Sequence, residues 1–84
     1  METDFGARRE RRMRLLRALY GRTDADVRLY EDAHEIAVEL GIDHDEVPRI
    51  IAYLEERGYV VATGATGATI RITADGIDRV ESGG

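Results

Sequence analysis

Cysteine and lysine are both absent from this chain of 84 residues. Without cysteine there is no disulfide, no thiolate metal ligand and no thiol nucleophile, and nothing ties the chain to an oxidising compartment. The N-terminus has no apolar run of signal-peptide length, and no stretch is long enough to span a membrane. We therefore expect a cytoplasmic protein with one domain over 1–84, loose at 1–6 and 82–84, and too small for a deep pocket.

Because lysine is missing, all 12 basic residues are arginine, against 17 acidic residues and a net charge of −5. Such an acidic, arginine-only composition is typical either of a GC-rich genome or of a salt-loving host, and we favour the halophilic host. The charge is unevenly spread, at +3 over residues 1–30 and −8 over residues 31–84. Six arginines fall within 8–17, so the basic charge is concentrated in the first expected helix.

Apolar spacing predicts a fold that is α+β and mostly helical. Residues at intervals of three and four indicate helices, and alternating residues indicate strands. The expected order is helix, short strand, helix, helix, β-hairpin, helix, over 7–20, 27–30, about 31–40, about 44–57, 59–73 and 74 to about 81.

Glycines and short polar side chains define the expected helix ends. Gly21, Gly41 and Gly58 are placed to stop the first three helices. The third helix can be capped by Asp43 or Asp45, and Asp43 with the acid three positions later, Glu46, forms a possible capping box. The last helix is expected to be capped by Thr73.

Three segments of this chain resemble the core of prokaryotic winged helix-turn-helix transcriptional regulators. They are HEIAVELGID at 34–43, VPRIIAYLEERGYV at 47–60 and ITADGIDRV at 72–80, and the likeness extends over about residues 10–81. It implies a winged helix-turn-helix fold with a three-helix core, a β-hairpin wing and a short C-terminal helix. It also implies that the third helix is the recognition helix that enters the major groove of DNA.

The residues expected to contact DNA lie on three elements. Outward positions of the third helix can reach base edges or phosphates, the hairpin can touch phosphate weakly, and the arginines of the first helix can form a phosphate-contacting patch. This patch is otherwise a site for an anionic partner or a solvated helix face. The candidates are His44, Arg49 and Tyr53 on the third helix, Thr66 and Arg71 on the hairpin, and Arg8, Arg9, Arg11 and Arg12 on the first helix.

Other kinds of chemistry find little support in the sequence. His34 and His44 are ten residues apart without metal-ligand spacing, so no metal is expected. The Gly-Ala-Thr repeat at 64–69 lacks the lysine and following helix of a phosphate-binding loop and is interpreted as a hairpin tip. The acidic residues form no evident acid–base pair. We expect neither an enzyme nor a cofactor.

Two functions remain open. The first is a transcriptional regulator that binds double-stranded DNA as a homodimer, paired through the first and last helices. The second is a winged-helix module that docks on a protein partner and does not bind DNA, as favoured by the acidic third helix and the uncharged hairpin tip. The expected dimer contacts are Met13, Leu15, Tyr20, Ile77 or Val80.

Overall fold

The computed structural model describes residues 5–83 and shows an α+β fold that is mainly helical. Within these residues, four α-helices and one 3₁₀ turn surround a three-stranded antiparallel sheet of order β1-β3-β2. None of the helices in this range is long and apolar enough to cross a membrane. The elements are α1 (Phe5–Thr23), β1 (Glu31–Asp32), α2 (Ala33–Leu40), η1 (His44–Glu46), α3 (Val47–Glu56), β2 (Val60–Thr63), β3 (Thr69–Ile72) and α4 (Ala74–Glu81).

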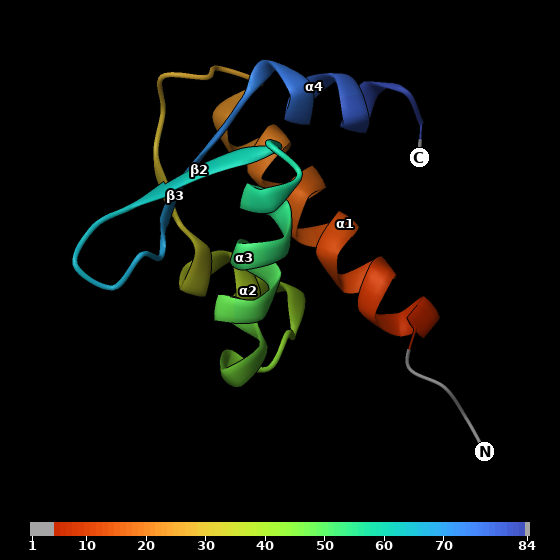
Figure 1. Cartoon of the computed structure of the whole chain (residues 1–84), viewed down its shortest axis with the longest axis vertical. Helices are drawn as coiled ribbons and strands as arrows, with labels where there is room; N and C mark the ends of the chain where they lie inside the picture. Colours follow the sequence, from red (N-terminus) through yellow and green to blue (C-terminus); the bar gives the residue numbers. More distant parts are fainter. Residues whose placement is uncertain (1–4, 84) are drawn as a thin grey trace.

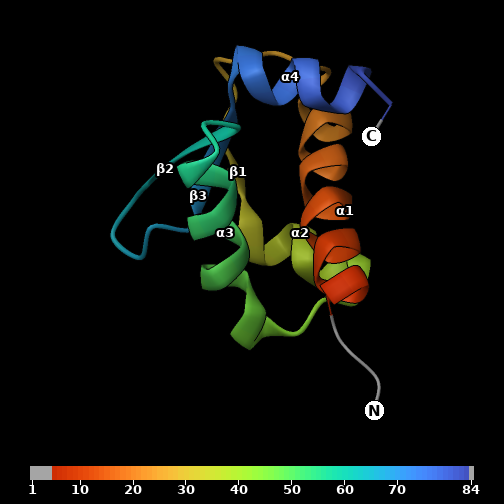
Figure 2. The ribbon, with the colours of Figure 1, turned by 45° about the vertical axis from the view of Figure 1, so that its right-hand side comes forward.

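Helix α3 lies between α1 and the turn of the β2–β3 hairpin, as both views of the ribbon show (Figures 1 and 2). Helix α4 runs across the C-terminal end of α1 and lies close to the loop that follows α1. The two flanks of α3 therefore face different neighbours, α1 on one side and the hairpin turn on the other.

The core lies where α1, α2 and α3 meet one face of the sheet. Leu16 and Leu19 of α1, Ile36 of α2 and Leu54 of α3 are all fully buried. On β3, Ile70 and Ile72 point into the core, while Thr69 and Arg71, which alternate with them, are only partly buried, as the alternation predicts. The other buried apolar residues are Met13, Leu15, Ala33, Ala37, Ile42, Val47, Ile50, Ile51, Val60 and Ala68.

Helix α1 is longer than the sequence predicts at both ends. It begins at Phe5, two residues before the expected start, while residues 1–4 and 84 lie outside the described range. The predicted stop at Gly21 is wrong, because the left-handed residues that end the helix are Asp24 and Ala25, with φ of 54° and 59°. The Thr23 hydroxyl donates to the carbonyl of Leu19 and so satisfies the last turn internally.

The strand predicted over 27–30 is also wrong. The carboxylate of Asp26 accepts from the backbone N–H of Arg28 at 2.9 Å, and this turn replaces the extended chain. Strand β1 begins only at Glu31, which pairs with Ile70 of β3. Val27, Leu29 and Tyr30 are consequently exposed.

The remaining local predictions are largely confirmed. Asp32 caps α2, which begins two residues later than expected, and left-handed Gly41 ends it. The hairpin forms with Val60 opposite Ile72, and Thr73 caps α4 by accepting from the N–H of Gly76.

Asp43 does cap the 3₁₀ turn that precedes α3, through the N–H of Asp45. The predicted capping box is wrong, because the Glu46 carboxylate turns away from the backbone of Asp43 and pairs with Arg11 of α1 instead.

One arginine ties the end of α1 to the elements that follow it. Three different guanidinium nitrogens of Arg22 contact the carboxylates of Glu31, Glu35 and Glu39, at 2.9, 3.5 and 2.9 Å. The hydrogen bond to Glu31, followed by that to Glu39, raises the pKa of Arg22. Glu35 and Glu39 lie one turn apart on α2, so this single cation offsets their mutual repulsion.

Candidate nucleic-acid interface

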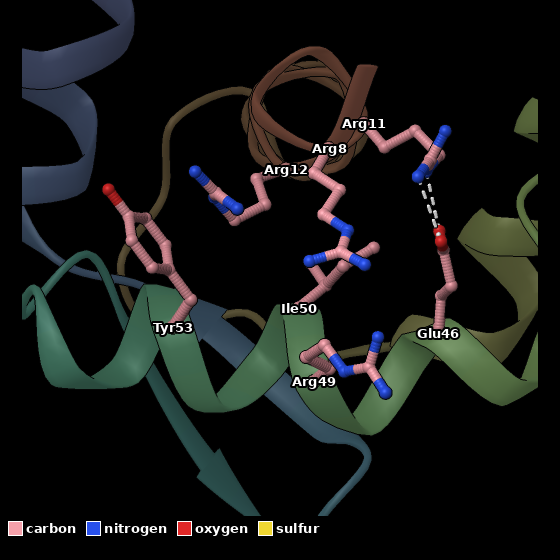
Figure 3. Close-up of a pocket in the computed structure, with 7 residues that line it drawn as sticks. All are labelled: Arg8, Arg11, Arg12, Glu46, Arg49, Ile50 and Tyr53. Carbon is pink, nitrogen blue, oxygen red and sulfur yellow. Dashed lines mark hydrogen bonds and ion pairs between the residues drawn. The ribbon is translucent and has the colours of Figure 1, made fainter. Parts of the chain in front are cut away.

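Helices α1 and α3 enclose a groove that collects charged side chains far apart in the sequence (Figure 3). Its volume is about 120 Å³, and the buried side chain of Ile50 gives it an apolar floor. Five of the nine residues predicted to contact DNA line this α1–α3 groove. Its lining consists of Arg8, Arg11 and Arg12 from α1, Glu46 from η1, and Arg49, Ile50 and Tyr53 from α3.

One end of the α1–α3 groove is closed by an ion pair. The guanidinium of Arg11 meets the carboxylate of Glu46 through two contacts, Nε to Oε1 at 2.5 Å and Nη2 to Oε2 at 2.8 Å. Both side chains are 27% exposed, so this ion pair, with its one hydrogen bond from Nη2 to Oε2, is partly shielded from water. Arg11 therefore joins α1 to the residue that precedes α3.

The other arginines of the α1–α3 groove have no acidic partner within residues 5–83. The guanidinium of Arg12 lies over the ring of Tyr53, 3.9 Å from its centroid. Arg8 points from α1 towards α3, and Arg49 extends from the exposed surface of α3 (Figure 3). A cation–π contact such as that between Arg12 and Tyr53 stabilises by about 0.5–1 kcal/mol at an exposed site, and it orders both side chains.

A second depression adjoins the groove and shares Arg12 and Tyr53 with it. It has a volume of about 230 Å³, and we call it the arginine hollow. No acidic side chain lines it within the described part of the chain. Its lining consists of Arg9, Arg12 and Met13 from α1, Tyr53 from α3, Arg57 and Tyr59 from the segment after α3, and Arg79 from α4.

The sequence did not single out Arg57, Tyr59 or Arg79. Arg57 lies just after α3, with its guanidinium 5.8 Å from the centroid of the Tyr59 ring. The pKa of Arg57 is raised, chiefly by its interaction with the Tyr59 side chain. The signal in the sequence was an arginine just after α3, Arg57, and another in the last turn of α4, Arg79, positions that the helix dipole favours in any case.

The opposite flank of α3 faces the hairpin turn and lacks arginine. A depression of about 200 Å³ there is lined by His34, Pro48, Ile51, Ala52, Glu55, Thr66, Gly67 and Ala68. Thr66 is exposed at the hairpin turn, on this flank. His44 is also exposed, and its ring stacks on that of His34 with centroids 4.3 Å apart.

Two further predicted residues lie outside the α1–α3 groove. Arg71 lies opposite Val61 in the hairpin and points away from the core, because Ile70 and Ile72 on either side of it point inward. Arg9 lines the arginine hollow. The structure therefore brings Arg8, Arg11, Arg12, Arg49 and Tyr53 together, places Arg9 beside them, and leaves His44, Thr66 and Arg71 elsewhere.

Part of the surface expected to form a dimer is buried or hydrogen-bonded by contacts within the chain itself. Leu15 is fully buried and Met13 is 9% exposed, so the expectation that these two side chains pair with a second copy is wrong. The Tyr20 hydroxyl donates to the Glu81 carboxylate at 2.8 Å, which joins α1 to α4 and raises the pKa of Tyr20. Ile77 and Val80 pack on the core but stay half-buried.

Neither a protein-family model, nor a curated protein, nor a solved structure matches this chain. Within residues 5–83, no group of three or more histidine, cysteine, aspartate or glutamate side chains is placed to hold a metal ion.

Proposed function

We propose that this chain is a winged helix-turn-helix domain that binds double-stranded DNA as a cytoplasmic transcriptional regulator, without a catalytic role. Helices α2 and α3 would be the helix-turn-helix, and the β2–β3 hairpin would be the wing. The element order supports this assignment, since two short helices joined by a tight turn pack on a third helix and on a hairpin sheet.

The observation that carries the proposal is the convergence of Arg8, Arg12 and Arg49 on the α1–α3 groove. None of the three forms an ion pair within the described residues, although the chain holds 17 acidic residues and has a net charge of −5. Free guanidiniums that neutralise phosphates release condensed counterions, and this release supplies most of the non-specific affinity for DNA. An arginine-rich groove in an acidic protein suits this task.

The charge distribution also suggests how the duplex would lie. Arg49 and Tyr53 are exposed on α3, where arginine can reach a guanine edge and a tyrosine hydroxyl can reach a phosphate. Arg8 and Arg12 of α1 would hold the phosphates beside them. The opposite flank of α3 offers Glu55 and the uncharged hairpin turn. We therefore expect the phosphate backbone to run along the α1 side of α3.

A homodimer is part of the proposal. A single small domain makes few base contacts, and a second copy on a neighbouring half-site increases the affinity without any new kind of contact. Of the apolar side chains expected at this interface, Ile77 and Val80 on α4 are the ones that stay half-buried.

The second candidate is a module that docks on a protein and does not bind DNA. Exposed apolar residues favour it, since Val27, Leu29 and Tyr30 lie together in the loop before β1, with Leu29 and Tyr30 each 47% exposed. The acidic residue on the hairpin side of α3, Glu55, also suits a basic protein better than a phosphate backbone.

Fluorescence anisotropy of a labelled mixed-sequence duplex, titrated across a salt series, tests the DNA proposal. The wild type is compared with Arg8→Ala/Arg12→Ala and with the charge-matched control Arg17→Ala/Arg28→Ala, whose arginines lie outside the α1–α3 groove. Each phosphate contact contributes about 0.9 to the slope of log affinity against log salt, so the groove variant should lose about 1.8. Between 50 and 200 mM salt, the wild type should then lose about 12-fold more affinity than the groove variant does.

The control variant should bind like the wild type, and Arg49→Ala should weaken binding further when it is added to the groove variant. If the wild type does not bind even at the lowest salt, the DNA proposal fails and the protein-docking function takes its place. If both double variants lose affinity equally, the attraction does not come from the groove. Far-UV circular dichroism confirms that each variant is folded.

A further inference from the structure

The arginine hollow gathers four guanidiniums from three separate segments of the chain. Arg9 and Arg12 come from α1, Arg57 from the end of α3, and Arg79 from α4. None of the four forms an ion pair with an acidic side chain of residues 5–83. Placing like charges around one hollow is unfavourable unless an anion or counterions occupy it, so the arrangement favours an anionic ligand.

Acidic residues adjoin this site beside Arg57 and Arg79. Arg57, Tyr59 and Arg79 also line an adjoining, open depression together with Glu56, Asp75 and Asp78. These three carboxylates do not line the arginine hollow itself. They lower the repulsion between the two arginines when the hollow is empty, and they leave its interior to an incoming anion.

The composition of the hollow indicates which anion it suits. A guanidinium presents parallel N–H donors that match the oxygens of a phosphate group, and tyrosine hydroxyls add further donors. Four guanidiniums exceed the charge that one carboxylate needs and match a phosphoryl group or a pair of them. The volume of about 230 Å³ is below that of pockets for drug-sized ligands, roughly 300 Å³ and above, so it suits phosphoryl groups better than a whole nucleotide.

The hollow also shares a wall with the α1–α3 groove. Arg12 and Tyr53 line both depressions, and the Arg12 guanidinium rests on the Tyr53 ring between them. An anion in the hollow would attract Arg12 and neutralise charge that a DNA phosphate requires. Occupancy of the hollow and of the groove should therefore oppose each other.

We infer that the arginine hollow binds the phosphate group of a small molecule and that this binding weakens the hold on DNA. The second half of the inference rests on the proposed function, whereas the first half does not. Phosphate groups also occur in the DNA backbone, so the experiment has to separate the two sources.

The first measurement is isothermal titration of the full chain with pyrophosphate, at ionic strength held constant with sodium chloride and without DNA. The wild type should bind one pyrophosphate saturably. Arg79→Ala should weaken binding at least about tenfold, as expected for the loss of one charge-assisted contact, and Arg57→Ala should do the same. Arg28→Ala, which removes an exposed arginine outside the hollow, should bind like the wild type.

The absence of saturable binding by the wild type would overturn the inference. So would equal affinities of Arg79→Ala and Arg28→Ala, because the binding would then not depend on the hollow. Thermal melts show whether each variant is folded, and the use of two hollow variants keeps the test valid if one of them is not.

The second measurement repeats the DNA titration with and without pyrophosphate at equal ionic strength. Pyrophosphate should lower the DNA affinity of the wild type severalfold and leave that of Arg79→Ala unchanged. If Arg79→Ala weakens DNA binding as much as Arg12→Ala does while pyrophosphate fails to bind, the DNA backbone fills the hollow and the small-molecule assignment is wrong. If the wild type binds no DNA, the proposed function fails, and the first measurement still decides whether the hollow binds phosphate.

Discussion

At Gly76, α4 packs closely against Tyr59 and Ile72, and the replacement of this glycine by alanine gives a sharp test of the packing. A Cβ atom at this position would lie 2.2 Å from the carbonyl oxygen of Tyr59 and 2.8 Å from Cγ1 of Ile72. Gly76 belongs to helix α4 and does not have a positive φ. The position therefore requires glycine for space and not for backbone conformation.

Two opposing effects determine the expected change in stability. Replacing a helical glycine by alanine normally stabilises by about 0.5–1 kcal/mol. To clear the Tyr59 carbonyl, however, α4 must move away by about 1 Å, and overpacking of this kind typically costs about 1–3 kcal/mol. The same movement stretches the bond from the Thr73 N–H to the Tyr59 carbonyl, which is 3.0 Å long. We expect Gly76→Ala to lower the free energy of unfolding by about 1–2 kcal/mol.

Thermal and urea unfolding followed by far-UV circular dichroism measure this change. For a domain of this size, about 1 kcal/mol corresponds to roughly 4–8 °C in Tm. The matched control is Gly21→Ala, also a glycine in a helix, whose added Cβ meets nothing within 4 Å. It should raise stability by about 0.5–1 kcal/mol. If Gly76→Ala is as stable as the wild type, or if both variants shift in the same direction, the close approach of α4 to Tyr59 is wrong.

Two further predictions concern exposed residues. Thr66→Ala should leave DNA affinity and its salt dependence unchanged within about twofold, since Thr66 is uncharged and lies on the hairpin side of α3. A larger loss of affinity in the anisotropy assay would place the duplex against the hairpin. Side-chain and backbone hydrogen bonds from Arg28 lower the pKa of Asp26 from 3.8 to about 2, so its stabilising effect is complete above about pH 4 and is lost as the pH falls towards 2. Asp26→Asn should therefore make the fall in Tm between pH 4 and pH 2 shallower, and an unchanged profile would contradict the role of this pair.

Local signals in the sequence were sufficient for most helices and for the hairpin. Gly41 and Gly58 both take the left-handed conformation that ends a helix, with φ of 72° and 77°, and Thr73 caps α4 as its position indicated. Each of these features depends on residues within a few positions of one another. Gly21 does not end α1, because glycine permits the left-handed conformation without requiring it. Asp24 and Ala25, further along the chain, adopt this conformation instead.

The candidate site could be predicted only in part, because it depends on how distant segments pack. The sequence indicated Arg12 on one helix and Tyr53 on another, but nothing in a pattern of single residues places one against the other. The pairing of Arg11 with Glu46 is equally non-local, and it also displaced the capping box that the local spacing suggested. Arg79 enters the arginine hollow only because α4 folds back over the end of α1.

The contacts of Arg22 bear on the unusual composition of this chain. Its Nε, Nη1 and Nη2 atoms each serve a different carboxylate, from β1 and from two successive turns of α2. Lysine carries a single nitrogen at the end of its side chain, so it could not contact all three acids from one position. At residue 22, the structure therefore favours arginine, because an exchange to lysine could not keep all three of these contacts.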